Sequence, residues 1–171
     1  GDAKVRVDNS SGSVKGTTAM AVLSVDNSSG RTEIRALRPL QEFHVDSSSG
    51  SVRLEGGALK ADVDSSSGSV HLFDLLGDAS VDTSSGSAEL VWQSIPPGTK
   101  VRVDTSSGGA HLTFPAGTEL DGEIDTSSGG IRSDFSCNSK ERDHAEFKGG
   151  PDAIRLTVDT SSGSVRLVKA G

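Results

Sequence analysis

Eight copies of the pentapeptide Asp-(Asn/Ser/Thr)-Ser-Ser-Gly run through the whole chain. Successive aspartates are 18 to 22 residues apart, except for the last two, which are 34 residues apart. A motif that recurs at such an interval indicates one supersecondary unit stacked on itself. The copies begin at Asp8, Asp26, Asp46, Asp64, Asp82, Asp104, Asp125 and Asp159.

Apolar residues occupy alternate positions on both sides of each pentapeptide. The residue before the aspartate is always Val or Ile, as in Val103 and Ile124, and a leucine such as Leu112 commonly stands eight residues after it. Alternation on both sides of a Ser-Ser-Gly bend predicts two short, half-buried strands joined by a turn. Each copy therefore corresponds to one coil with two strands.

The positions between the apolar residues are polar and vary in charge from one copy to the next. Strands stack about 4.8 Å apart, so these residues should be neighbours on an outer face, where opposite charges favour one register. We expect His44 to pair with Asp62, and His71 and His111 to pair with Glu89. Lys15, Glu33 and Arg53 should likewise be neighbours of alternating charge on successive strands.

The composition favours a narrow core over a central globular one. Only 32% of the 171 residues are hydrophobic, there is no tyrosine, and there are 21 glycines. In a solenoid, each coil contributes only a few apolar side chains to a shared core. We therefore predict an all-β fold: one domain over residues 1–171, a single-stranded parallel β-solenoid (β-helix) of eight to nine coils, with about 18–22 residues per coil. By analogy with parallel crossovers, the coils should be right-handed.

The second half of each coil varies in length and carries the Gly and Pro turn residues. Large apolar residues in this half are expected to close the far side of the core. The long interval between Asp125 and Asp159 leaves two alternatives for about residues 132–152, a degenerate coil or an excursion loop, with 145–148 as its strand. The core residues expected in the second half are Leu37, Leu59, Leu75, Trp92 and Phe114.

Each pentapeptide is interpreted as a corner of the solenoid. The aspartate would accept hydrogen bonds from the following amides in an Asx turn, and the glycine would adopt a positive φ. The alternative is a row of calcium ions along the column of eight aspartates, because carboxylate oxygens suit calcium. The structural turn glycines are Gly12, Gly30, Gly50, Gly68, Gly86, Gly108, Gly129 and Gly163.

The serines and threonines of the motif are interpreted as structural, with stacked hydroxyls forming a polar ladder. A nucleophilic serine needs a base and an oxyanion site, and eight equivalent serines without a neighbouring histidine do not supply them. Asn9-Ser10-Ser11 and Asn27-Ser28-Ser29 match the N-glycosylation triplet, but they are also the motif with Asn in its second position.

Several functional classes are disfavoured. The net charge of −7, with both signs interspersed, argues against nucleic-acid binding. No apolar run approaches the length of a membrane span. The single cysteine, Cys137, excludes an internal disulfide and a cysteine-based zinc site. His144, near Cys137 in the irregular segment, is the one histidine free for another role, with a solvated loop or a metal cluster as the alternatives. We expect no enzyme activity, no cofactor and no resident metal.

The recurring Val-Asp-Thr-Ser-Ser-Gly-Ser-Val-x-Leu resembles the repeats of a bacterial adhesin family of β-strand-repeat proteins. The resemblance covers nearly the whole chain, and it implies an exported single-stranded β-solenoid, often behind a signal peptide or membrane anchor. Matching stretches lie at residues 7–16, 45–54, 63–72, 81–90, 103–112 and 158–167.

The two ends of the repeat array set the functional hypothesis. Solenoid ends expose strand edges and usually carry capping segments, for which neither end here leaves room. Either the chain is a piece of a longer protein, or the last coil of one subunit stacks on the first coil of the next, which generates a fibre. The predicted subunit interface is Val5, Val7, Val14, Leu156, Val158, Val165 and Leu167.

These observations predict a non-enzymatic structural protein that polymerises head to tail into an extracellular filament or cell-surface fibre. The start at Gly1 is compatible with a processed secreted protein or with a trimmed piece of a longer chain. The scarcity of Cys and Met, with abundant Ser, Thr and Gly, favours an exported protein whose signal peptide has been removed. The alternative is a monomeric adhesin-like module that binds a glycan or a surface protein through its variable half-coils, including Trp92, Phe114 and residues 134–150.

Overall fold

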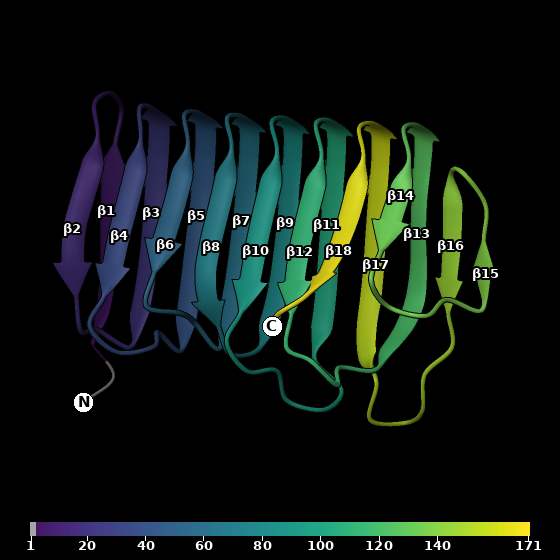
Figure 1. Cartoon of the computed structure of the whole chain (residues 1–171). Helices are drawn as coiled ribbons and strands as arrows, with labels where there is room; N and C mark the ends of the chain where they lie inside the picture. Colours follow the sequence, from purple (N-terminus) through teal and green to yellow (C-terminus); the bar gives the residue numbers. More distant parts are fainter. Residues whose placement is uncertain (1–2) are drawn as a thin grey trace.

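The structure is a computed structural model that describes residues 3–171. These residues form 18 strands in two sheets, with no helix among them (Figure 1). No helix able to cross a membrane is therefore found in this range. The predicted all-β parallel solenoid is confirmed.

Sheet A contains the strand that leads into each Ser-Ser-Gly bend. Its spatial order is β1-β3-β5-β7-β9-β11-β17-β13-β16-β15. The strands are β1 (Lys4–Asn9), β3 (Val22–Ser29), β5 (Glu42–Ser49), β7 (Lys60–Ser67), β9 (Asp78–Ser85), β11 (Lys100–Ser107), β13 (Leu120–Ser128), β15 (Ser139–Lys140), β16 (His144–Phe147) and β17 (Ile154–Ser162).

Sheet B contains the strand that follows each bend. Its spatial order is β14-β18-β12-β10-β8-β6-β4-β2, and all of its pairings are parallel. The strands are β2 (Val14–Thr18), β4 (Thr32–Ala36), β6 (Val52–Glu55), β8 (Val70–Leu75), β10 (Ala88–Trp92), β12 (Ala110–Phe114), β14 (Ile131–Ser133) and β18 (Val165–Lys169).

Each coil consists of one strand from each sheet, which gives eight coils in residues 3–171. In Figure 1 the sheet A strands of the eight coils run upward at the back and the strands of sheet B run downward in front, while coils β1–β2 to β11–β12 advance from left to right. This path makes those coils right-handed.

The coils stack in register on their aspartates. Asp104, for example, is the strand partner of Asp82 on one side and of Asp159 on the other. The apolar residues on both sides of the motif point between the sheets, so that Val103 and Leu112 are 1% and 0% exposed. The core is therefore a narrow apolar strip between two flat sheets, as the alternation predicts.

The motif glycines lie at the bends, where backbones of successive coils approach closely. Six of the eight have positive φ, between 101° and 140°. Gly129 and Gly163 do not have a φ in this range, but a Cβ on either would meet the backbone oxygen of the glycine in the next coil. At these two positions the close approach of the neighbouring backbone by itself requires glycine.

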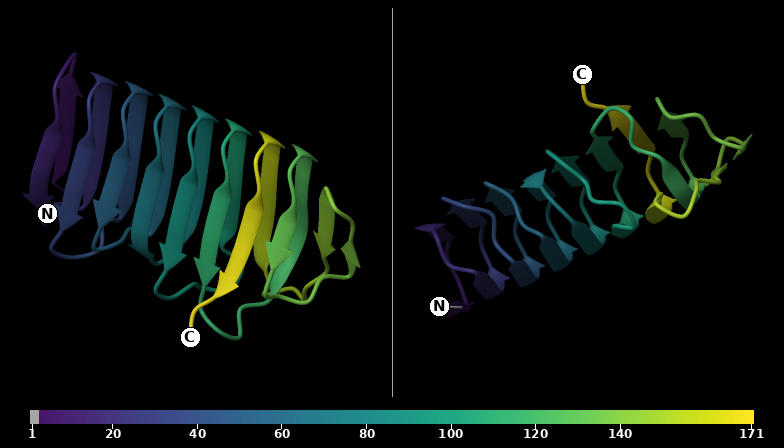
Figure 2. Two further views of the ribbon diagram at one scale, coloured as in Figure 1. Left: turned by 45° about the horizontal axis from the view of Figure 1, so that its top comes forward. Right: turned by 90° about the horizontal axis from the view of Figure 1, so that it is seen from below.

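The last coil in the sequence lies inside the solenoid. β17 pairs with β11 on one side and β13 on the other, and β18 lies between β12 and β14 (Figure 2). This arrangement corrects the predicted subunit interface at one end, because a side chain with a coil on each side cannot contact another subunit. Its four C-terminal members, Leu156, Val158, Val165 and Leu167, are at most 1% exposed.

The irregular segment covers the end of sheet A. β16 pairs antiparallel with β13, and β15 pairs antiparallel with β16. The excursion-loop alternative for residues 132–152 is thus correct, with β16 close to the expected strand at 145–148. This segment acts as a cap, so the expectation that neither end has room for one is wrong at this end. Ala145 and Phe147 are buried against the core.

The far side of the core is closed by some of the residues expected there. Leu75, Trp92 and Phe114 are buried, and the rings of Trp92 and Phe114 stack with centroids 4.7 Å apart. The prediction is wrong for Leu37 and Leu59, which are 70% and 48% exposed. Because Trp92 and Phe114 are buried, they are not available for ligand binding as the alternative functional hypothesis requires.

Candidate functional site

The column of eight aspartates lies on the outer face of sheet A. Its spatial order ends Asp104–Asp159–Asp125, because the last coil is inserted. Cations lie near both ends of the column: Arg6 is 3.0 Å from Asp8, and the Nδ1 atom of His144 is 2.6 Å from Asp125. In the part of the chain that the structure describes, no motif aspartate accepts a hydrogen bond from an amide of its own bend. The predicted Asx turn is therefore wrong.

The residue after the aspartate points into the solenoid, and in five of the eight copies its side chain donates to a glycine carbonyl oxygen at a bend. Ser65 donates to the carbonyl oxygen of Ser67 instead, and the hydroxyls of Ser47 and Thr83 have no partner among the described residues. Asn27 donates to Gly30 at 3.2 Å, and Thr105 donates to Gly86 of the preceding coil at 3.3 Å. Asn27 is only 1% exposed, so its triplet cannot serve as a glycosylation site in the folded protein. The Ser and Thr hydroxyls of the motif thus bond backbone carbonyl oxygens, and within the described residues they do not form the expected ladder of hydroxyls bonded to one another.

Strand register sets the aspartate carboxylates in a line and does not gather them around a point. Within residues 3–171 there is no group of three or more His, Cys, Asp or Glu side chains placed to hold a metal ion. The segment that contains His144 and Cys137 likewise has no such group. The line of carboxylates is therefore an electrostatic feature of the surface, and we propose no metal site on it.

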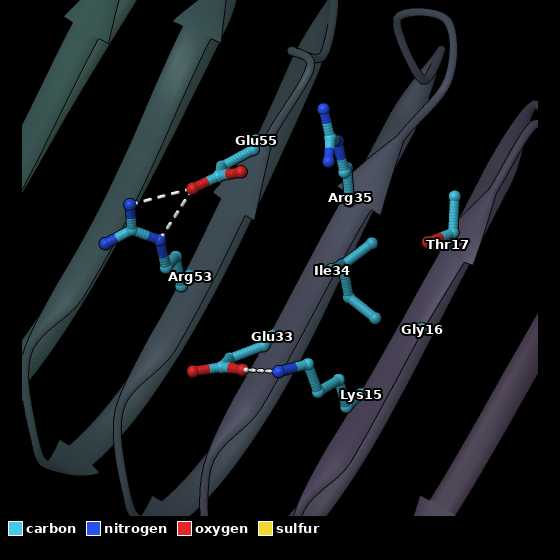
Figure 3. A pocket seen from close by; sticks show the side chains of 8 residues that line it. All are labelled: Lys15, Gly16, Thr17, Glu33, Ile34, Arg35, Arg53 and Glu55. Atoms are coloured by element: carbon cyan, nitrogen blue, oxygen red, sulfur yellow. Dashed lines mark hydrogen bonds and ion pairs between the residues drawn. The ribbon is translucent and has the colours of Figure 1, made fainter.

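The outer face of sheet B carries paired charges over its first five coils. Lys15 is 3.1 Å from Glu33, and Arg53 is 2.7 Å from Glu55. Both pairs line a surface depression over β2, β4 and β6, beside Gly16 (Figure 3). Both carboxylates of the depression form ion pairs with cations, and its side chains do not point toward one common position (Figure 3). The depression therefore lacks the geometry of a site for acid–base catalysis.

The expected histidine pairs are found in two of three cases. His44 lies 3.5 Å from Asp62, and His71 lies 2.9 Å from Glu89. His111 makes no ion pair with a carboxylate in the described part of the chain, so this expectation is wrong. Glu89 is the strand neighbour of both histidines, but its carboxylate is directed to His71.

Three shifted pKa values follow from this arrangement. The hydrogen bond to Asp125 raises the pKa of His144, and burial together with the neighbouring carboxylates of Asp104 and Asp64 raises the pKa of Asp82. The hydrogen bond from Lys15 lowers the pKa of Glu33. The sequence did not reveal the His144 pair, because it depends on the antiparallel return of β16.

We expect the protein to be more stable at about pH 6 than at about pH 8.5. A histidine with a raised pKa stabilises the fold fully below its ordinary value of 6.5, and this stabilisation is lost as the pH rises through the folded-state pKa. The raised pKa of Asp82 acts in the same direction at lower pH. Urea unfolding followed by circular dichroism should show the higher midpoint at the lower pH.

The control for this prediction is His144→Gln, which removes the titrating group at the end of the aspartate column. The variant should lose most of the difference between the two pH values. An unchanged difference in the variant would show that the Asp125–His144 pair does not cause it.

Comparison with known proteins supports the fold and leaves the function open. The Toastrack DUF4097 family matches the chain over residues 2–168. No curated protein and no solved structure matches it. The match agrees with a β-solenoid built from repeated coils, as implied by the resemblance noted in the sequence.

Proposed function

We propose, from the premise that the chain belongs to the Toastrack DUF4097 family, that it is a non-enzymatic structural β-solenoid that associates end to end with a second copy of itself. One observation carries the proposal. Among residues 3–171, β1 and β2 each pair on one side only, whereas the opposite end of sheet A is covered by β16 and β15. An open edge of this kind presents unpaired backbone groups to another strand.

The side chains at the open edge are only half-covered. Val5, Val7 and Val14 pack against the core but remain partly exposed, whereas Val25, the strand partner of Val7, is 1% exposed. A second edge placed against this one would bury the three valines and satisfy the backbone groups of β1 and β2. Burial of apolar area favours the contact.

The charges of β1 favour a two-fold arrangement. Two identical edges that meet about a two-fold axis normal to the sheets run antiparallel. If the axis passes through Val7, Arg6 of each copy lies directly opposite Asp8 of the other copy. Opposite charges at directly opposed positions stabilise such a pair of strands.

The same axis suits β2. Val7 and Gly16 lie equally far along the chain from the bend that joins β1 and β2, so an axis through Val7 also passes close to Gly16. Gly16 has no side chain, and a Cβ at this position would meet no atom within 4 Å. The two copies can therefore approach closely on both sheets.

We therefore propose a dimer of two solenoids joined at their β1–β2 edges, in place of the predicted head-to-tail fibre. A fibre needs a second edge that continues every column, but the other end consists of the three-residue strand β14 and the antiparallel strands β16 and β15. We further propose an extracellular or cell-surface location, which the scarcity of Cys and Met supports.

Sedimentation equilibrium tests the association. We expect the mass of two chains at about 100 µM protein and dissociation on dilution. Arg6→Asp should raise the dissociation constant of the two copies by about tenfold or more. The substitution places an aspartate opposite Asp8 of the other copy, and the two-fold axis makes this happen twice. The double variant Arg6→Asp/Asp8→Arg should recover much of the loss, since it restores opposite charges across the axis.

Arg102→Asp is the matched control. Arg102 occupies the same column on β11, near Asp104, far from the edge. This variant changes the net charge equally and should leave the association unchanged. A monomer at every concentration would refute the proposal, and masses that grow beyond two chains would favour a head-to-tail fibre.

A further inference from the structure

The end of sheet B opposite the open edge carries three neighbouring cationic or titratable side chains. His111 on β12 is the strand partner of Arg166 on β18, which is the strand partner of Arg132 on β14. We call these three residues the basic row. β12, β18 and β14 lie side by side in Figure 1, with strands about 4.8 Å apart.

The basic row differs from the paired charges on the same face. Three cationic or titratable side chains elsewhere on sheet B have a carboxylate partner, as in Lys15–Glu33 and His71–Glu89. Arg35 and Lys169 have none among the described residues, but neither of them has a cation as its strand partner. Within residues 3–171, no member of the basic row makes an ion pair with a carboxylate. The side chains of Arg166 and Arg132 are exposed, and that of His111 is partly exposed. Like charges on adjacent strands oppose each other, so this row is short of negative charge.

The row follows from the alignment of the last three coils. Insertion of β18 places Arg166 between His111 and Arg132, whereas stacking in sequence order would place Arg132 between His111 and Arg166. In either order the two arginines are neighbours and one of them lies beside the histidine. Two acidic residues beside the row have other partners. Glu89, the strand partner of His111, pairs with His71, and Asp134, two residues after Arg132, accepts a hydrogen bond from the backbone of Lys169.

The residues beside the row are small. On the side of the bend, the aligned residues are Gly109, Ser164 and Gly130. On the other side lie Thr113 and Val168, both half-buried. A face of this shape suits a polymer that lies across the strands and offers negative charges and hydroxyl groups along its length. It has no exposed aromatic ring on which a nucleic-acid base could stack.

We propose that the basic row binds a linear anionic polysaccharide that carries carboxylate or sulfate groups. The two arginines donate charge-assisted hydrogen bonds to the anionic groups, and the chain of sugars runs perpendicular to the strands. The row lies at the far end from β1 and β2, so this site is independent of the association of two copies.

The test uses the full chain and three fluorescent probes at low ionic strength: a heparin oligosaccharide, a polygalacturonate oligosaccharide and poly-L-glutamate. Fluorescence anisotropy should show binding of at least one polysaccharide and weaker binding of the peptide. Arg132→Gln/Arg166→Gln should weaken polysaccharide binding by about tenfold or more. Arg132→Lys/Arg166→Lys should retain part of it, which separates charge from fold.

Lys15→Gln/Arg53→Gln is the matched control. It removes the same charge from the same face, but from side chains that are already paired, and should change binding by about twofold at most. The unfolding midpoints should agree among the variants. Absence of binding to both polysaccharides, equal loss in the control, or equally tight binding of poly-L-glutamate would each overturn the proposal.

Discussion

Replacing Gly108 by alanine is expected to destabilise the protein several times more than the same change at Gly12. Both residues turn the chain at the same place in their coils, with φ of 136° and 101°. A Cβ at Gly108 would collide with the backbone oxygen of Gly86 in the preceding coil, whereas a Cβ at Gly12 meets no atom within 4 Å. Gly12→Ala should cost about 1–2 kcal/mol from its conformation alone, and Gly108→Ala more than about 3 kcal/mol.

Urea unfolding of the two variants measures this difference directly. Gly130→Ala serves as a control, because Gly130 has neither a positive φ nor a close neighbour. Its unfolding midpoint should stay near that of the parent chain. Equal costs at Gly12 and Gly108 would mean that conformation alone, and not the contact between coils, makes glycine necessary at the bend.

Val158→Asp is expected to prevent stable folding, whereas Val7→Asp should leave a folded protein. Both valines directly precede a motif aspartate and point into the core. Val158 has Val103 and Ile124 as strand partners on its two sides and is 1% exposed, whereas Val7 has Val25 on one side only and is partly exposed. A carboxylate at Val158 would be buried without a partner, at a cost on the order of 4 kcal/mol or more.

Far-UV circular dichroism and thermal unfolding distinguish the two variants. Val7→Asp should keep the β spectrum with a modest loss of stability, and it should also weaken the proposed association of two copies. If Val158→Asp unfolded no more easily than Val7→Asp, the coil formed by β17 and β18 would have to lie at an end of the solenoid.

Much of the fold could be predicted because every coil has the same alternation of apolar and polar residues around its motif. Alternation around Val103 and Leu112 identified both strands of a coil, and alignment of the copies on their aspartates identified the strand register. The order of the coils in space could not be read in this way. Every copy of the motif fits beside every other copy, so the sequence does not show that Asp159 lies between Asp104 and Asp125.

The surface was predicted less well than the core, for a related reason. His71 and Glu89 lie on consecutive coils, and their pairing follows from the alignment. The pair of His144 with Asp125 depends on an antiparallel strand outside the repeat, and the order of the three residues in the basic row depends on the insertion of Arg166. The Asx turn predicted for the motif aspartate was also wrong. An aspartate before a bend can either accept hydrogen bonds from the amides of that bend or point to solvent on the outer face of the sheet. Only the backbone geometry shows which of the two occurs.

The position of β17 and β18 also sets an order for folding. Coils β1–β2 to β11–β12 can each settle on the coil before them as the nascent chain emerges. The coil of β13 and β14 cannot, because the place beside β11 and β12 belongs to residues 154–169, which are synthesised later. Both of the last two coils therefore reach their final places only after residues 154–169 have been synthesised, in a late step that closes a long loop and is slow for that reason. Until then, the edge formed by β11 and β12 lacks its native partner.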